Sequence, residues 1–78
     1  MNQPAKAHEP SMEEILASIR RIIADAPARI RSGGWLVLEI GADQGDAVRE
    51  LFVASGFQDV AVQPDLAGHD RIALGRRP

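Results

Sequence analysis

Residues 33–57, GGWLVLEIGADQGDAVRELFVASGF, decide the fold of this chain. The large and β-branched apolar side chains at 35–40 predict a strand that is buried on both faces, as in a parallel sheet. Trp35 is therefore expected in the core, with its indole N–H bonded to a local acceptor. Glu39 is the only charged residue in this apolar run. Two interpretations stay open: it points to solvent at the sheet margin, or it caps a helix or contacts a substrate at the sheet's carboxyl edge.

A helix is predicted directly after this strand, over residues 46–55. Its apolar face is made by Ala47, Val48, Leu51 and Phe52. Asp46 favours the N-terminal end, Gly56 is a natural helix stop, and Phe57 is expected to fold back on the helix. The connection GADQG, at 41–45, follows a strand and precedes a helix, where ligands bind in open α/β sheets. A plain connecting turn has the same composition.

The remaining residues predict two more strands. Residues 59–63 alternate between polar and apolar side chains and are closed by Pro64, whereas DLAGHD at 65–70 reads as a loop. Residues 71–76, RIALGR, form the last short strand. A strand–helix–strand crossover implies a parallel pair with a right-handed connection.

Upstream of the strand, residues 11–24 predict an amphipathic helix. Ser11 and Glu14 have the spacing of a capping box. One apolar stripe runs along the helix, made by Met12, Ile15, Leu16, Ile19, Ile22 and Ile23. A helix this short is marginal in water, so the stripe is expected to pack on something.

Pro27 interrupts this helical region. Its missing N–H predicts a kink or break near 24–26, with Asp25 capping a second short segment. The SGG at 32–34 then ends the helical region. Residues 1–10 are polar and contain prolines, which predicts a disordered tail.

Composition limits what the chain does. A length of 78 residues allows one small domain of modest stability. The net charge of −2 gives no global attraction to nucleic acid or to an anionic membrane. We find no signal peptide, no apolar run of membrane-spanning length and no cysteine, which fits a cytoplasmic protein. His8 and His69 stand alone, without metal-ligand spacing.

Residues 21–77 resemble the C-terminal end of the release-factor glutamine N5-methyltransferase family. The resemblance is carried by RRIIADAPARI, GGWLVLEIG, QGDAVRELFVASGF, DLAG and DRIALGRR. It implies the last third of a class I methyltransferase: strand five, the last large helix, strand six, and an antiparallel strand seven between five and six. The predicted fold is therefore α/β, with a three-stranded mixed sheet in the order five–seven–six and one crossover helix.

The resemblance also implies a chemistry whose residues are absent here. The family methylates the glutamine of the Gly-Gly-Gln motif in release factors with S-adenosylmethionine. It binds the cofactor through a glycine-rich motif and an acidic residue, and it uses a catalytic Asn-Pro-Pro-Tyr. This chain contains no Asn-Pro pair, no tyrosine and no such glycine-rich loop. We therefore predict no catalytic, cofactor-binding or metal-binding residue, and no bound cofactor for this chain alone.

Residues 9–25, EPSMEEILASIRRIIAD, resemble the N-terminal helix of the alphaproteobacterial polar-organising protein. That resemblance implies docking on cell-pole partners, with Met12, Ile15, Leu16, Ile19 and Ile22 as the protein-binding residues. Both resemblances include RRIIAD, so residues 20–25 are the expected seam of a fusion. The predicted organisation is a tail at 1–10, a helix at 11–25 and a methyltransferase fragment at 26–78.

Three hypotheses of function follow. The chain is a methyltransferase fragment without activity of its own, an interaction module that docks through its helix, or a fusion product without function. The predicted helix at 46–55 packs on one sheet face. The other face is expected to be exposed and to support self-association, unless Ile15, Leu16 and Ile19 fold across it.

Overall fold

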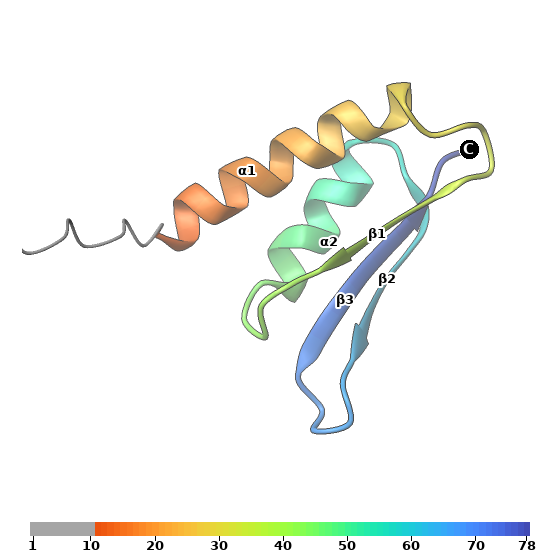
Figure 1. The fold of residues 1–78 in the computed structure, drawn as a ribbon. Coiled ribbons are helices and arrows are strands. Elements are labelled where there is room, and N and C mark those ends of the chain that lie inside the picture. Colours follow the sequence, from red (N-terminus) through yellow and green to blue (C-terminus); the bar gives the residue numbers. More distant parts are fainter. Residues whose placement is uncertain (1–10) are drawn as a thin grey trace, which may run out of the picture.

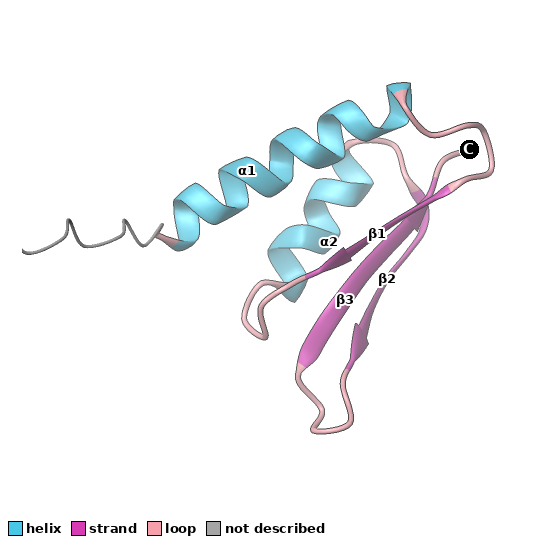
Figure 2. Ribbon diagram, in the orientation of Figure 1, coloured by secondary structure: helices cyan, strands magenta, loops and turns pink. Residues whose placement is uncertain are grey.

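The computed structural model describes residues 11–78, so the predicted tail at 1–10 and His8 lie outside the described residues. The chain order is α1 (Met12–Asp25), η1 (Ala26–Ala28), β1 (Trp35–Glu39), α2 (Gly45–Ala54), β2 (Gln58–Pro64) and β3 (Asp70–Arg76). The two α-helices pack together beside a three-stranded sheet (Figure 1, Figure 2). Among the described residues, no helix has the length and apolarity that crossing a membrane requires.

Helix α1 begins where the capping signal predicts. The Glu14 N–H donates to the Ser11 hydroxyl at 3.2 Å, which satisfies one of the free donors of the first turn. The helix ends at Asp25, and a short 3-10 segment, η1, carries Pro27 in its first turn. The predicted break is therefore confirmed. The predicted cap is not, because the Asp25 side chain makes no capping hydrogen bond and the Ala26 N–H still donates to the Ile22 carbonyl.

The sheet has the predicted strand order, but it is not mixed. Strand β3 lies between β1 and β2 and pairs antiparallel with both. Strands β1 and β2 therefore run in the same direction, as the crossover through α2 requires, but they share no hydrogen bonds. The predicted parallel pair is wrong, because β3 inserts between its two members.

Strand β1 is not buried on both faces as predicted. Its exposure alternates from residue to residue, so only Leu36 and Leu38 face the core. Trp35 is 49% exposed and Val37 is 58% exposed. The prediction that Trp35 lies in the core is therefore wrong: its place in the strand puts it on the outer face, opposite the helices.

The core lies between the helices and the inner face of the sheet. Its largest fully buried side chains are Phe52 and Val48 of α2 and Ile23 of α1. Ile23 therefore shares one core with residues of the predicted 26–78 unit. The boundary predicted between residues 25 and 26 stays a prediction about where two sequences of different origin were joined.

The end of α2 is built as predicted. Gly56 adopts a φ of +86°, which a residue without a Cβ tolerates well. The Gly56 N–H donates to Val53 and the Phe57 N–H to Phe52, which is the hydrogen-bond pattern of a Schellman motif. The Phe57 ring packs edge-on against Phe52 at a centroid distance of 5.2 Å. This contact fixes where the chain turns into β2.

The outer face of the sheet is exposed, as predicted for a fragment. The register places five apolar residues on this face: Trp35 and Val37, which are exposed, and Ala61, Ile72 and Leu74, which are half-buried. Helix α1 does not cover it: Leu16 and Ile19 pack against the core on the opposite side of the sheet.

Candidate functional site

The carboxyl edge of β1 is the first place where a ligand site was expected, and its geometry is that of a turn. The Gln44 side chain is buried, and its Oε1 accepts from the Gly41 N–H at 2.7 Å. The Gln44 N–H donates to the Gly41 carbonyl at 3.0 Å. These two hydrogen bonds join Gly41 and Gln44 and close residues 41–44 into a turn. This supports the interpretation as a plain connecting turn.

A glycine is needed at position 45, the first residue of α2, because a neighbouring side chain leaves no room for a Cβ. A bound ligand is not the reason. A Cβ at this position would collide with the carboxylate of Asp70, and Val62 lies beside it. Sequence reasoning missed this contact, because Asp70 belongs to a strand that is far away along the chain. The glycine therefore allows close packing of α2 on β3.

The other candidate side chains are not brought together. Glu39 is exposed on the outer face, so the interpretation that it points to solvent is the one that the structure favours. His69 is exposed in the loop between β2 and β3. That loop is held by Asp65, whose Oδ1 accepts from the N–H groups of Ala67 and His69. Within residues 11–78 no group of acidic or histidine side chains is arranged to hold a metal ion.

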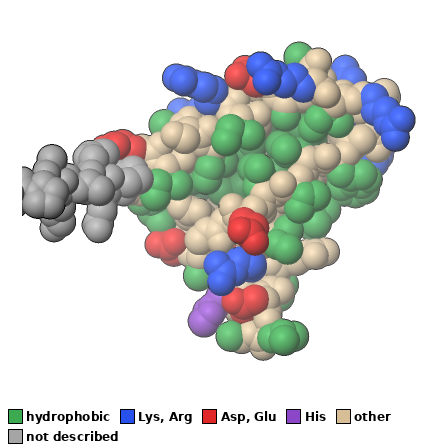
Figure 3. All heavy atoms as spheres, viewed as in Figure 1, with side chains coloured by type: hydrophobic (Ala, Val, Ile, Leu, Met, Phe, Trp, Pro, Cys, Tyr) green, Lys and Arg blue, Asp and Glu red, His purple; other side chains and the backbone are tan. Residues whose placement is uncertain are grey.

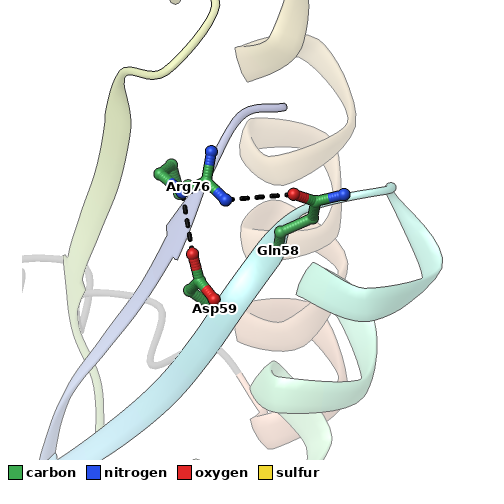
Figure 4. Close-up of polar contacts among 3 residues, drawn as sticks. All are labelled: Gln58, Asp59 and Arg76. Atoms are coloured by element: carbon green, nitrogen blue, oxygen red, sulfur yellow. Dashed lines mark hydrogen bonds and ion pairs between the residues drawn. The ribbon is translucent and has the colours of Figure 1, made fainter.

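A polar contact that sequence reasoning did not find joins β2 to β3. Asp59 has a φ of +52°, and its carboxylate accepts from the Arg76 Nε at 2.8 Å (Figure 4). A second guanidinium nitrogen of Arg76 donates to the Gln58 side chain at 3.0 Å. The ion pair is exposed, so it contributes about 1 kcal/mol or less. It fixes the irregular start of β2 and has no catalytic geometry.

The predicted protein-binding stripe of α1 is divided by the fold. Leu16 and Ile19 pack against the core, and Ile15 is half-buried. Met12 is 41% exposed and Ile22 is 49% exposed. Of the five residues predicted to bind a partner, these two are the most available.

Ile22 borders a hollow of about 350 Å³ between the end of α1 and β1. Its lining residues are Arg21, Ile22, Asp25, Ala26, Arg29, Ile30 and Leu36. Within residues 11–78, Arg21 and Arg29 have no ion-pair partner. Figure 3 shows Lys and Arg side chains gathered along the upper side of the molecule, where α1 lies in the same view. The hollow is thus apolar inside, and its rim carries the charges of Arg21, Asp25 and Arg29.

The described residues form a small α/β unit with a crossover helix, an open antiparallel sheet and no catalytic group of side chains. No family model matches the chain. It is 51% identical over 63 residues to the release factor glutamine methyltransferase of Xylella fastidiosa, which covers 81% of this chain and 23% of that protein. It is 52% identical over 61 residues to the release factor glutamine methyltransferase of Pseudomonas aeruginosa, covering 78% of this chain and 22% of the relative. The enzyme of the same name from Neisseria gonorrhoeae is 49% identical over 61 residues, 78% of this chain and 22% of that protein.

These relatives confirm the methyltransferase resemblance for most of the chain. The chain spans between a fifth and a quarter of their length. They give no support to the resemblance between residues 9–25 and the polar-organising protein, which stays a prediction.

Proposed function

We propose that this chain is the C-terminal segment of a methyltransferase that acts on peptide-chain release factors, and that it supplies part of the sheet and none of the reacting groups. The observation that carries the proposal is the similarity of about 50% identity over about 80% of the chain. The strand order β1-β3-β2 supports it, because the resemblance implies the order five–seven–six. In this proposal S-adenosylmethionine binds the part of the methyltransferase that lies outside this chain.

The test is reconstitution. The chain would be mixed or coexpressed with the Pseudomonas aeruginosa relative truncated before the matched region, and methyl transfer from labelled S-adenosylmethionine to a purified release factor would be measured. We expect no transfer by either part alone and transfer by the two together. A control with Gly75→Val in this chain should fail, because its side chain would collide with Phe52. Methyl transfer by this chain alone would refute the proposal.

We propose the uncovered outer face as the surface that the rest of such an enzyme covers. Trp35 and Val37 are the exposed apolar residues of this face in β1. Without the rest of the enzyme, the same face supports self-association of the chain.

A second candidate function is docking through α1, as the polar-organising resemblance implies. The exposure of Met12 and Ile22 favours it. Changes at Ile19 or Leu16 are poor tests, because both residues pack against the core. A pull-down from an alphaproteobacterial lysate should therefore compare wild type with Met12→Asp and Ile22→Asp, with Val53→Asp on exposed α2 surface as control. Equal capture of cell-pole proteins by all variants would count against this function.

A further inference from the structure

The hairpin formed by β2 and β3 extends beyond the rest of the sheet. Strand β1 pairs with β3 as far as Glu39, and β2 reaches the same level at Gln63, because both residues lie opposite Ile72. Strand β2 then continues to Pro64, and residues 65–69 connect it to β3. Figure 1 shows this connection projecting past the end of β1. We call residues 65–69 the tip loop.

The tip loop lies at the edge of the sheet where ligands bind in α/β folds. Strands β1 and β2 run in the same direction, so their carboxyl ends, at Glu39 and Pro64, lie at one edge. Helix α2 begins at the same edge, since Gly45 lies against Asp70, the first residue of β3. Ligands of open α/β sheets bind outside the carboxyl ends of the strands. In a complete enzyme of this fold, the tip loop therefore stands beside the substrate.

Asp65 holds the backbone of the tip loop in place. Its Oδ1 accepts from the N–H groups of Ala67 and His69 at 2.9 and 3.0 Å. Its carbonyl accepts from the Gly68 N–H at 3.0 Å, and its own N–H donates to the His69 carbonyl at 2.8 Å. These hydrogen bonds order the loop before a partner arrives. Binding through it therefore costs little conformational entropy.

The tip loop presents an apolar side chain that takes no part in holding the loop. Leu66 is fully exposed, more than any other large hydrophobic residue of the described chain, and Ala67 beside it is also exposed. Figure 3 shows hydrophobic side chains at the corresponding lower end of the molecule. Single exposed apolar residues are common on proteins, so exposure alone indicates nothing. Leu66 differs because an ordered loop holds it at the edge where substrates bind.

The charges around the tip loop favour neither an acidic nor a basic partner. The titratable side chains of this edge have both signs: Glu39, Asp43, Asp65, His69, Asp70 and Arg71. The Asp65 carboxylate is occupied by the N–H groups of its own loop, and the Asp70 carboxylate lies half-buried against α2. The contact that this loop offers is therefore apolar, and burial of one leucine side chain supplies its affinity.

The β2 side of the sheet is closed to further strands. Strand β2 ends in Pro64, and its register with β3 shifts near both ends. Prolines and bulges prevent pairing along a sheet edge. A partner that reaches the tip loop therefore approaches from the carboxyl edge, which is the side of the substrate.

We propose that the tip loop contacts the protein substrate, and that Leu66 inserts into an apolar recess on the release factor. Leu66 is then a positioning residue that binds the substrate away from the reacting atoms. The inference rests on the proposed function and adds to it a substrate contact supplied by this chain.

The test measures methyl transfer by the chain combined with the truncated relative described above. Leu66→Ser should lower kcat/KM for the release factor about tenfold through a higher KM, and should leave kcat and the KM for S-adenosylmethionine unchanged. Leu66→Met should restore most of the loss, because it keeps an apolar side chain of similar size. Val53→Ser, an exposed apolar position on α2, should have no effect. Equal KM values for wild type and Leu66→Ser overturn the inference.

A photocrosslink identifies what the tip loop touches. With photoreactive benzoylphenylalanine in place of Leu66, irradiation of the three-component mixture should join this chain to the release factor. A crosslink to the truncated relative alone overturns the inference, and so does the absence of any crosslink. If the wild-type chain and the truncated relative transfer no methyl group together, the proposed function fails and the inference falls with it. Full wild-type activity with an unchanged KM for Leu66→Ser refutes the inference alone.

Discussion

At the scale of single residues, two glycines show how tightly α2 approaches the sheet. A Cβ on Gly75 would lie 2.6 Å from Cδ1 of Phe52 and 3.0 Å from Cβ of Phe57. Gly45 faces the Asp70 carboxylate in the same way. Neither requirement is visible in the sequence, because each depends on a neighbour in another element. The positive φ of Gly56 was predictable, since it follows from local helix-end chemistry.

Gly75→Ala is predicted to lower the free energy of unfolding by about 1–3 kcal/mol, because the added methyl overpacks the core against Phe52. Urea unfolding followed by circular dichroism measures the change. Ala61→Val is the control: it adds volume in the neighbouring strand at a half-buried position on the outer face, away from the helices. Similar losses for both variants would mean that Gly75 does not face the core.

Gly45→Ala is predicted to destabilise the chain by about 1 kcal/mol, since the methyl must displace the Asp70 carboxylate. With Asp70→Ala present, the same change should become neutral or stabilising, because alanine is the better helix former by up to about 1 kcal/mol. A double-mutant cycle in urea gives the coupling between the two sites. Additive effects would show that these residues do not touch.

At the scale of elements, the sequence predicted each helix and strand that the structure contains, because periodicity and turn chemistry are local signals. The sequence did not predict how deeply each face of an element is buried, because burial depends on the other elements that pack against it. Strand β1 was expected to be buried on both faces, but its outer residues Trp35 and Val37 are 49% and 58% exposed. The apolar stripe of α1 was predicted, but its division between core and surface was not.

Adjacent isoleucines of α1 test this division. Ile23 is fully buried and Ile22 is 49% exposed. Ile23→Ala should lower the free energy of unfolding by about 2–5 kcal/mol, and Ile22→Ala should cost far less. Urea unfolding of both variants gives the comparison, and the matched chemistry makes each the control of the other. Equal and small losses would mean that α1 is not part of the folded unit.

At the scale of the whole molecule, the sheet formed by the described residues is open on its outer face and along β1, and the chain matches less than a quarter of the length of the curated relatives. The strand order was predictable because a resemblance implied it, whereas composition and spacing alone suggested a parallel pair. The absence of a catalytic residue was a prediction from the missing motifs. The candidate sites of this chain are therefore surfaces and not catalytic groups. Which residues such a surface exposes depends on how the elements pack, and no local sequence pattern encodes that packing.

Trp35 is the only tryptophan, so its fluorescence reports on the outer face of the sheet. In the isolated chain at low concentration we predict emission and acrylamide quenching typical of an indole that is 49% exposed. Addition of a tryptophan-free form of the truncated relative should shift the emission to shorter wavelength and reduce quenching, because burial removes the ring from water. Val37→Lys should prevent the shift by placing a charge in the covered face, whereas Val53→Lys, on exposed α2 surface, should not. If the two parts associate and the quenching stays the same, the outer face is not the surface that joins them.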